Sequence, residues 1–235
     1  MDRLDGHKGP IPWEDNPDNP KYYRQMVPDV RQPSWGDFFY WLNEYYSHGE
    51  HGVLYTDQRT PNNLIKVINL DITDSESNWQ MADFIEDNWQ RNVEGLVEIY
   101  SFTRCEVKSG IKNPLQDRVA TTNAPYVEVM RVLDMDNGDE LAMWVMEKAD
   151  YIGMNHPDLT QNEMIKRVAS AAENITVRTG EMISDLRPSN YGFRQDGTAF
   201  IFDFNIESVT PIEITLNEIS LFEYYAKRIK MNAKV

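Results

Sequence analysis

The sequence predicts an α+β protein, because segments with the spacing of strands alternate with segments with the spacing of helices. Apolar runs flank Asp136-Asn137-Gly138-Asp139, and a second pair flanks Gln195-Asp196-Gly197. Asn-Gly and Asp-Gly between apolar runs predict β-hairpins. Thr160 and Glu163 form a capping box ahead of a run with helical periodicity, which predicts the start of a long helix.

The composition is that of a globular protein and argues against several classes of function. Of the 235 residues 41% are hydrophobic, and no apolar run is long enough to span a membrane. The net charge of −15 argues against a broad nucleic-acid-binding face, because phosphate binding needs clustered Lys and Arg. The acidity favours a basic partner or metal ions, unless it only solubilises the surface.

The cysteine content and the N-terminal residues indicate a cytoplasmic protein. Cys105 is the single cysteine, which argues against an internal disulfide framework and fits a reducing compartment. One cysteine and four histidines are too few for a structural zinc site to be expected. The first residues lack the apolar core of a signal peptide, so secretion is not expected.

The N-terminal segment is predicted to be an extended arm followed by a helix. Residues 1–33 hold six of the twelve prolines and little apolar periodicity, which indicates an extended arm. A helix should begin near Ser34, where Asp37 stands close to a capping-box position. The apolar face of this helix would comprise Trp35, Phe38, Phe39, Leu42, Tyr45 and Tyr46.

The remaining elements follow from the period of the apolar residues. We expect strands at Val53–Tyr55, Leu64–Ile68, Tyr126–Leu133, Leu141–Met146, Tyr191–Phe193 and Ala199–Phe202. We expect helices over Ser75–Asn92, from Gln161 to Gly180, and over Leu216–Met231, the last with Ile219, Phe222, Ala226 and Ile229 on one face. The polar stretch Thr103–Pro125 indicates an insertion loop between strands.

Three polar residues form the most informative pattern. Asp185 and Asn190 are five residues apart, and Asp203 lies thirteen residues beyond Asn190. The Asp-Gly hairpin between them can return Asp203 to the side of Asn190. Carboxylate and carboxamide oxygens suit Mg²⁺, and a remaining carboxylate can accept the proton of a nucleophilic hydroxyl.

This segment resembles the catalytic loop and metal-binding motif of protein kinases, H-R-D-L-K-P-x-N followed by D-F-G. The resemblance implies that Asp185 is the catalytic base, that Asn190 and Asp203 hold Mg²⁺, and that Arg187 replaces a lysine that contacts the transferred phosphate. The chain departs from the motif at two positions. Ile183 replaces the histidine, and Asn205 replaces the glycine.

The strand Leu64-Ile65-Lys66-Val67-Ile68 resembles the V-A-I-K motif, whose lysine contacts the α- and β-phosphates of ATP. Lys66 shares a strand face with Leu64 and Ile68, where an ammonium group needs a partner. Glu86 is the expected partner, with Glu94 and Asp83 as alternatives. Its helix places it in an apolar stripe of Trp79, Ala82, Trp89 and Val93.

Two weaker patterns lie at the positions that the resemblance requires. The run from Ser47 to Tyr55 is similar to the glycine-rich loop of kinases, with Gly49 and Gly52 near the phosphates. The run from Trp144 to Ala149 is similar to the last N-lobe strand and the hinge. Met146 would be the gatekeeper, and the backbone groups of Glu147 and Ala149 would face the adenine.

The resemblance implies a bilobal protein-kinase-like fold. The arm, 1–33, would precede a β-rich N-lobe, 34–149, and an abbreviated, mainly helical C-lobe, 150–235. Too few residues follow Asp203 for a full C-lobe, and none forms the A-P-E motif. This abbreviated form resembles the compact serine/threonine kinases made early in infection by some short-tailed bacteriophages, which implies host proteins as substrates and the host cytoplasm as location.

We therefore expect an ATP- and Mg²⁺-dependent serine/threonine protein kinase. A small-molecule kinase of the aminoglycoside or choline type is an alternative, since those enzymes share the same three polar residues. A pseudokinase or binding protein is a further alternative, supported by Ile183 and Asn205. Retention of all four polar residues, Lys66, Asp185, Asn190 and Asp203, argues against it.

Overall fold

The computed structural model describes residues 41–48, 52–71, 76–106, 140–216 and 219–233. The chain forms two compact units. The first unit contains the described residues up to Gln90 together with those of 99–148, and the second unit contains 91–98 and the described residues from Ala149 onward. The predicted arm (1–33), the strand at 126–133 and the turn at 136–139 lie outside the described residues.

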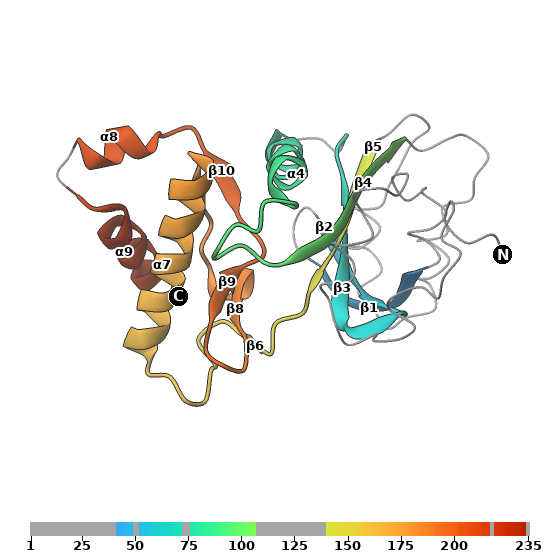
Figure 1. Cartoon of the computed structure of the whole chain (residues 1–235), viewed down its shortest axis with the longest axis horizontal. Helices are drawn as coiled ribbons and strands as arrows, with labels where there is room; N and C mark the ends of the chain where they lie inside the picture. Colours follow the sequence, from blue (N-terminus) through green and yellow to red (C-terminus); the bar gives the residue numbers. More distant parts are fainter. Residues whose placement is uncertain (1–40, 49–51, 72–75, 107–139, 217–218, 234–235) are drawn as a thin grey trace. The chain divides into compact units, whose positions relative to one another are not determined.

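The first unit is built on a five-stranded antiparallel sheet with the order β1-β2-β3-β5-β4. Its strands are β1 (Leu42–His48), β2 (Gly52–Asp57), β3 (Thr60–Asn69), β4 (Ile99–Glu106) and β5 (Glu140–Glu147). Figure 1 shows the helix α4 (Glu76–Asn88) beside this sheet. The central strands β3 and β5 are buried on both faces, which explains their nearly continuous apolar sequence.

Strand β1 corrects the prediction of a helix across Leu42–Tyr46. Tyr45 pairs with Tyr55 of β2, but the register shifts on both sides of Tyr45. Such irregularities add residues to one strand and break the strict alternation of side chains. The apolar residues of β1 therefore imitate helical spacing in the sequence.

Of two further predictions for the first unit, the helix is confirmed and the start of the insertion loop is wrong. The predicted helix over Ser75–Asn92 is confirmed as α4, which ends at Asn88. The insertion loop predicted from Thr103 is wrong over Thr103–Glu106, because these residues continue β4 and pair with β5 as far as Glu140. The pairing with a buried neighbour strand overrides the polar sequence.

The second unit combines short strands with three helices in its described part. A three-stranded sheet has the order β6 (Tyr151–Ile152), β8 (Tyr191–Phe193), β9 (Ala199–Ile201), and a ribbon pairs β7 (Met182–Ser184) with β10 (Asn205–Glu207). The helices are α7 (Gln161–Thr179), α8 (Pro211–Thr215) and α9 (Leu221–Asn232), and Figure 1 shows α7 beside α9. Among the described residues, the structure contains no helix with the length and apolarity needed to cross a bilayer.

Local signals account for the helix and hairpin boundaries of the second unit. The Thr160–Glu163 capping box is present at the start of α7, and Gly180 ends the helix with a left-handed φ of 81°. The predicted β8–β9 hairpin is also confirmed, with Gly197 at φ 80° in its turn. Both predictions depended on residues close together in the sequence.

The last helix is shorter than predicted and turns a different face inward. Ser220 and Glu223 form a capping box, so α9 begins at Leu221, whereas Leu216 caps the preceding helix α8. The buried residues of α9 are Leu221, Tyr225 and Ile229. Ile219 precedes the helix and is 44% exposed, so its predicted place on the buried face is wrong.

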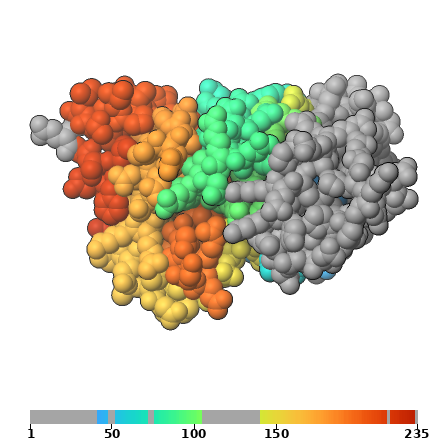
Figure 2. All heavy atoms as spheres, in the orientation of Figure 1, coloured from blue at the N-terminus to red at the C-terminus, as the bar shows by residue number. Residues whose placement is uncertain are grey.

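Residues 91–98 pack within the second unit although they follow α4. Leu96 forms a parallel bridge with Ile201, and the N–H of Val97 donates to the carbonyl oxygen of Ile201 over 2.9 Å. A Cβ atom at Gly95 would lie 2.4 Å from the carbonyl oxygen of Ala171, so only glycine permits this approach to α7. Figure 2 shows the segment in green against α7. The adjoining cavity of about 620 Å³ is lined by Glu94, an alternative partner of Lys66, but by no other predicted site residue.

Candidate functional site

In the second unit, Asp185 and Asp203 lie at the same end of the β7–β10 ribbon. Ser184, the last residue of β7, pairs with Asn205, the first residue of β10. Because the strands are antiparallel, Asp185 leaves the ribbon where Asp203 and Phe204 enter it. Phe204 is buried, while the side chains of Asp185 and Asp203 are half-buried.

Asn190 connects the two aspartates. Its carbonyl oxygen accepts the N–H groups of Phe202 (3.0 Å) and Asp203 (3.2 Å). Its side-chain Nδ2 donates to the carbonyl oxygen of Asp185 (2.8 Å) and to Oδ2 of the same residue (2.9 Å). The approach of Asp203 to Asn190 that the hairpin predicted is therefore present. We call Asp185, Arg187, Asn190 and Asp203 the polar cluster.

Asp185 has a strained backbone. Its φ is 58°, in the left-handed region that residues with a Cβ atom seldom occupy. The carbonyl oxygen of Asp185 accepts the N–H of Arg187 over 2.8 Å, and the carbonyl oxygen of Arg187 accepts the N–H of Asn190 over 2.9 Å. Strain of this kind persists only where surrounding contacts impose it, and it is common at functional sites.

Arg187 forms a two-point ion pair with Asp185. The distances are 2.6 Å from Nε to Oδ1 and 2.6 Å from the terminal nitrogen to Oδ2. Such fork-like pairing is specific to arginine. The Arg187 side chain is 57% exposed and that of Asp185 is 26% exposed, so the guanidinium can move toward solvent. Arg187 therefore occupies one acceptor position on each oxygen of the Asp185 carboxylate.

The oxygens of Asn190 and Asp203 suit a magnesium ion chemically. The Asn190 side-chain oxygen accepts the Ser189 hydroxyl over 2.9 Å and retains a second lone pair. Mg²⁺ is commonly bound by one or two protein oxygens, with phosphate and water completing the shell. In the part of the chain that the structure describes, no three His, Cys, Asp or Glu side chains form a metal-binding group. Water or phosphate oxygens would complete the shell of an ion held by Asn190 and Asp203.

The C-terminal helix holds the backbone on both sides of Asp185. Ile183 is fully buried, and its N–H donates to the Tyr225 hydroxyl over 3.2 Å. Asn232 donates from Nδ2 to the carbonyl oxygen of Leu186 over 3.2 Å. Sequence reasoning missed both residues of α9. A tyrosine at helical spacing between Leu221 and Ile229 was the available signal, because a buried tyrosine hydroxyl usually bonds to a polar group.

In the first unit, Lys66 lies inside the sheet as its apolar strand predicts. The side chain is 5% exposed. Its Nζ atom lies 3.7 Å from the Met81 sulfur of α4 and 5.6 Å from the centre of the Trp144 ring. Trp144 is the cross-strand neighbour of Lys66 on β5, and Leu54 is its neighbour on β2. The ammonium group thus lies near the Met81 sulfur and the Trp144 ring.

Glu86 corrects the expectation of an inward-facing glutamate. It is exposed on α4 and pairs with Nε of Arg104 on β4 over 2.8 Å. Asp83 also pairs with Arg104, whereas Glu94 lies in the second unit. The buried stripe of α4 comprises Asn78, Met81, Ala82, Phe84, Ile85 and Asn88. The predicted stripe was rotated, because Trp79 and Trp89 were assigned to the core and are only half-buried.

The glycine-rich segment spans the β1–β2 hairpin. His48 pairs with Val53, so the connection between the strands contains Gly49, which lies outside the described residues. Gly52 begins β2. A Cβ atom there would lie 2.7 Å from Cγ2 of Ile68 and 3.1 Å from Cε of Lys66. Glycine at this position therefore leaves room for the lysine side chain.

The predicted hinge residues occupy the end of β5. Met146 is buried opposite Leu64 of β3, and β5 ends at Glu147. The N–H of Lys148 donates to the carbonyl oxygen of Asn62 over 2.9 Å. Ala149 is the first residue of the later segment of the second unit. The chain thus leaves the sheet between Glu147 and Ala149, the two residues assigned to adenine.

No model of a known protein family matches the chain, and a search of curated proteins finds no match either. The function must therefore be argued from the side chains that the fold brings together.

Proposed function

We propose that the protein is an Mg²⁺- and ATP-dependent serine/threonine protein kinase. The observation that carries the proposal is the polar cluster of the second unit. Asn190 bonds to both aspartates, and Asp185 is held in a left-handed conformation. The Asn190 carboxamide contacts the Asp185 carboxylate, and the backbone of Asp203 bonds to that of Asn190, so these residues can supply what phosphoryl transfer requires, a metal ion and a group that orients the nucleophile.

Each polar residue has a distinct role in the proposed reaction. Asp185 orients a Ser or Thr hydroxyl, Asn190 and Asp203 would hold Mg²⁺, and Lys66 binds the α- and β-phosphates of ATP. When bound, the ion supplies positive charge that offsets the charge on the phosphate oxygens. The position of Lys66, buried on β3 and next to Gly52 of the glycine-rich segment, supports its role.

In the proposed step, one bond to the γ-phosphorus forms while another breaks, and Asp185 takes up the released proton. The substrate hydroxyl oxygen forms a bond to the γ-phosphorus while the bond from that phosphorus to the oxygen of ADP breaks. The hydroxyl proton passes to the Asp185 carboxylate. Arg187 leaves Asp185 and pairs with the transferred phosphate, which frees the carboxylate oxygen that accepts the proton.

The proposed substrates are protein hydroxyl groups, and the resemblance to compact phage kinases suggests bacterial host proteins in the host cytoplasm. The test is transfer from γ-labelled ATP with Mg²⁺ to the proteins of a bacterial lysate. Wild-type protein is compared with Asp185→Asn and Asp203→Asn, which keep the size of each side chain and remove its charge. We expect label on lysate proteins with the wild type only.

A matched control uses Asp196→Asn in the β8–β9 turn, where the carboxylate accepts the N–H of Thr198 over 2.8 Å and also bonds to the Thr198 side chain. This variant should label the lysate as the wild type does. Label on a small molecule instead of protein would identify a small-molecule kinase. Absence of any transfer by folded wild-type protein would overturn the enzyme proposal and leave a binding protein.

A further inference from the structure

We infer that Tyr225 and Asn232 of α9 are positioning residues for Asp185, an inference that rests on the proposed kinase function. These two side chains bond to the backbone on either side of the strained residue. Neither belongs to the polar cluster, and neither touches the Asp185 carboxylate through a described hydrogen bond. Their role is therefore to fix the backbone that carries the base.

The strain at Asp185 requires such support. A left-handed conformation is unfavourable for a residue with a Cβ atom, so an unconstrained chain would leave it. The contacts within the loop come from Arg187 and Asn190, which are themselves loop residues. Pairing of Ser184 with Asn205 fixes the chain before Asp185, and an anchor from another element adds a constraint on the position of Asp185.

Helix α9 supplies that anchor at two points. The Tyr225 hydroxyl accepts the N–H of Ile183, two residues before Asp185, and Asn232 donates to the carbonyl oxygen of Leu186, one residue after it. Tyr225 and Asn232 are seven residues apart, about two helical turns, so they project from one side of the helix. A single rigid element thus holds both flanks of the loop.

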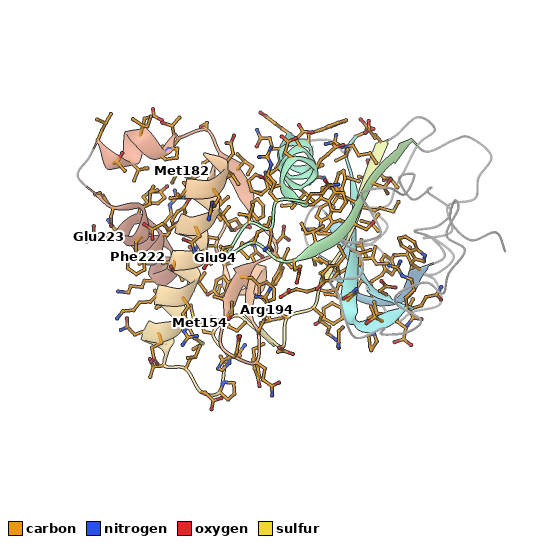
Figure 3. All side chains as sticks on the ribbon, viewed as in Figure 1. Glu94, Met154, Met182, Arg194, Phe222 and Glu223 are labelled. Atoms are coloured by element: carbon orange, nitrogen blue, oxygen red, sulfur yellow. The ribbon has the colours of Figure 1, made fainter. Side chains whose placement is uncertain are left out.

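Tyr225 is itself fixed in place. It is fully buried, and its hydroxyl lies 2.6 Å from the Thr176 hydroxyl of α7 and 3.6 Å from the Met182 sulfur. Figure 3 labels Met182 at the start of β7 and Glu223 in the first turn of α9. The hydroxyl therefore joins α7, α9 and β7. Removing it would leave the Ile183 N–H buried without that acceptor.

A second contact of α9 provides the matched control. Tyr224, the neighbour of Tyr225, donates its hydroxyl to Glu207 over 2.9 Å. Glu207 pairs with Met182, at the end of the ribbon away from Asp185. Tyr224→Phe and Tyr225→Phe each remove one hydroxyl from the same helix. Only the second removes a bond beside the base.

The first measurement is the steady-state kinetics of phosphotransfer by the full chain. Tyr225→Phe and Asn232→Ala should each lower kcat about tenfold to a hundredfold and leave the KM for ATP within about twofold, because misplacement of the base affects the chemical step. Tyr224→Phe should keep the wild-type kcat. Asn232 is half-buried at the helix end, so its variant folds even if Tyr225→Phe does not.

The second measurement is amide hydrogen exchange, which does not depend on activity. The N–H of Arg187, bonded to the carbonyl oxygen of Asp185, should exchange faster in Tyr225→Phe and Asn232→Ala than in Tyr224→Phe or the wild type. Amides of β8 and β9 should be unchanged and thereby report an intact fold. Wild-type kinetics together with wild-type exchange at Arg187 would overturn the inference. Faster exchange in a chain without phosphotransfer would support the anchor and reject the kinase proposal.

Discussion

The backbone N–H of Asp203 donates to the carbonyl oxygen of Asn190 over 3.2 Å, although thirteen residues separate the two in the sequence. The hairpin of β8 and β9 closes this interval. Because the bond involves only backbone atoms, the side chain of Asp203 can be changed without removing the contact that places it. Asp203 can therefore be replaced by a side chain of the same size while its backbone bond to Asn190 is kept.

Asp203→Asn should abolish magnesium-dependent phosphotransfer while the fold persists. A carboxamide offers Mg²⁺ a neutral oxygen, and loss of metal-assisted charge stabilisation lowers kcat by roughly a hundredfold or more. The measurement is phosphotransfer as a function of Mg²⁺ concentration, with hydrogen exchange at the Asp203 amide as the control for structure. A variant with the magnesium dependence of the wild type would contradict the assignment of Asp203.

Lys66→Met should remove phosphotransfer and leave the free energy of unfolding unchanged or higher. Burying an ammonium group costs free energy, whereas a methionine of similar length suits the environment of Met81 and Trp144. Chemical denaturation and phosphotransfer are measured on the same sample. Lys148→Met is the control, since Lys148 is half-exposed, 4.8 Å from the Tyr46 ring centre. A strongly destabilised Lys66→Met would show that the ammonium group has a structural role.

Arg187→Lys should retain more activity than Arg187→Ala, although less than the wild type. Lysine keeps the charge that offsets Asp185 and the transferred phosphate but cannot form the two-point pair seen at 2.6 Å. The expected loss in kcat is about tenfold for lysine and larger for alanine. Steady-state kinetics with a labelled protein substrate measures both. Equal activity of the two variants would exclude a role for the charge.

The free energy of unfolding should fall at high pH because of the Tyr191 hydroxyl. Burial raises the pKa of the Tyr191 hydroxyl from 10.0 to about 12. Between these values the unfolded chain loses the proton that the folded chain keeps, so the free energy of unfolding falls as the pH rises through this window. Tyr191→Phe should weaken this fall. The measurement is chemical denaturation at several pH values from 8 to about 12, a range that includes the ordinary pKa of tyrosine.

The same variant tests the cost of a buried hydroxyl. In the described part of the chain, the fully buried Tyr191 hydroxyl has no hydrogen-bond partner. Tyr191→Phe should therefore leave the free energy of unfolding at neutral pH unchanged or higher. Tyr224→Phe is the comparison, because the pKa of Tyr224 is also raised to about 12 while its hydroxyl bonds to Glu207. Destabilisation by Tyr191→Phe would indicate a bonded hydroxyl.

Short-range signals predicted the parts of the fold that depend on neighbouring residues. Thr160 with Glu163 gave the start of α7, and Asp196-Gly197 gave the β8–β9 turn, because caps and turns are decided within a few residues. The spacing of Asn190 and Asp203 around the hairpin likewise indicated that Asp203 returns to Asn190. Strand β1 was mistaken for a helix because its irregular register with β2 hides the alternation of side chains.

The contacts that sequence reasoning missed join segments far apart in the chain. Glu86 turns to Arg104, and Tyr225 reaches Ile183 across 42 residues. No local pattern specifies such partners, since the rotation of a helix depends on the surface it covers. A buried polar side chain indicates that a partner exists, but only the three-dimensional fold identifies it.

The return of residues 91–98 to the second unit means that the two units are interleaved in the chain. A fragment beginning at Ala149 would lack the Gly95 carbonyl oxygen that accepts the N–H of Ile201 over 2.9 Å, together with the bridge from Leu96. The edge of the small sheet next to α7 would then lie open to water. Cleavage at one position cannot separate the chain into two complete units, because each unit contains two separate stretches of sequence. During synthesis, residues 91–98 emerge first and must await the later segment that completes their packing.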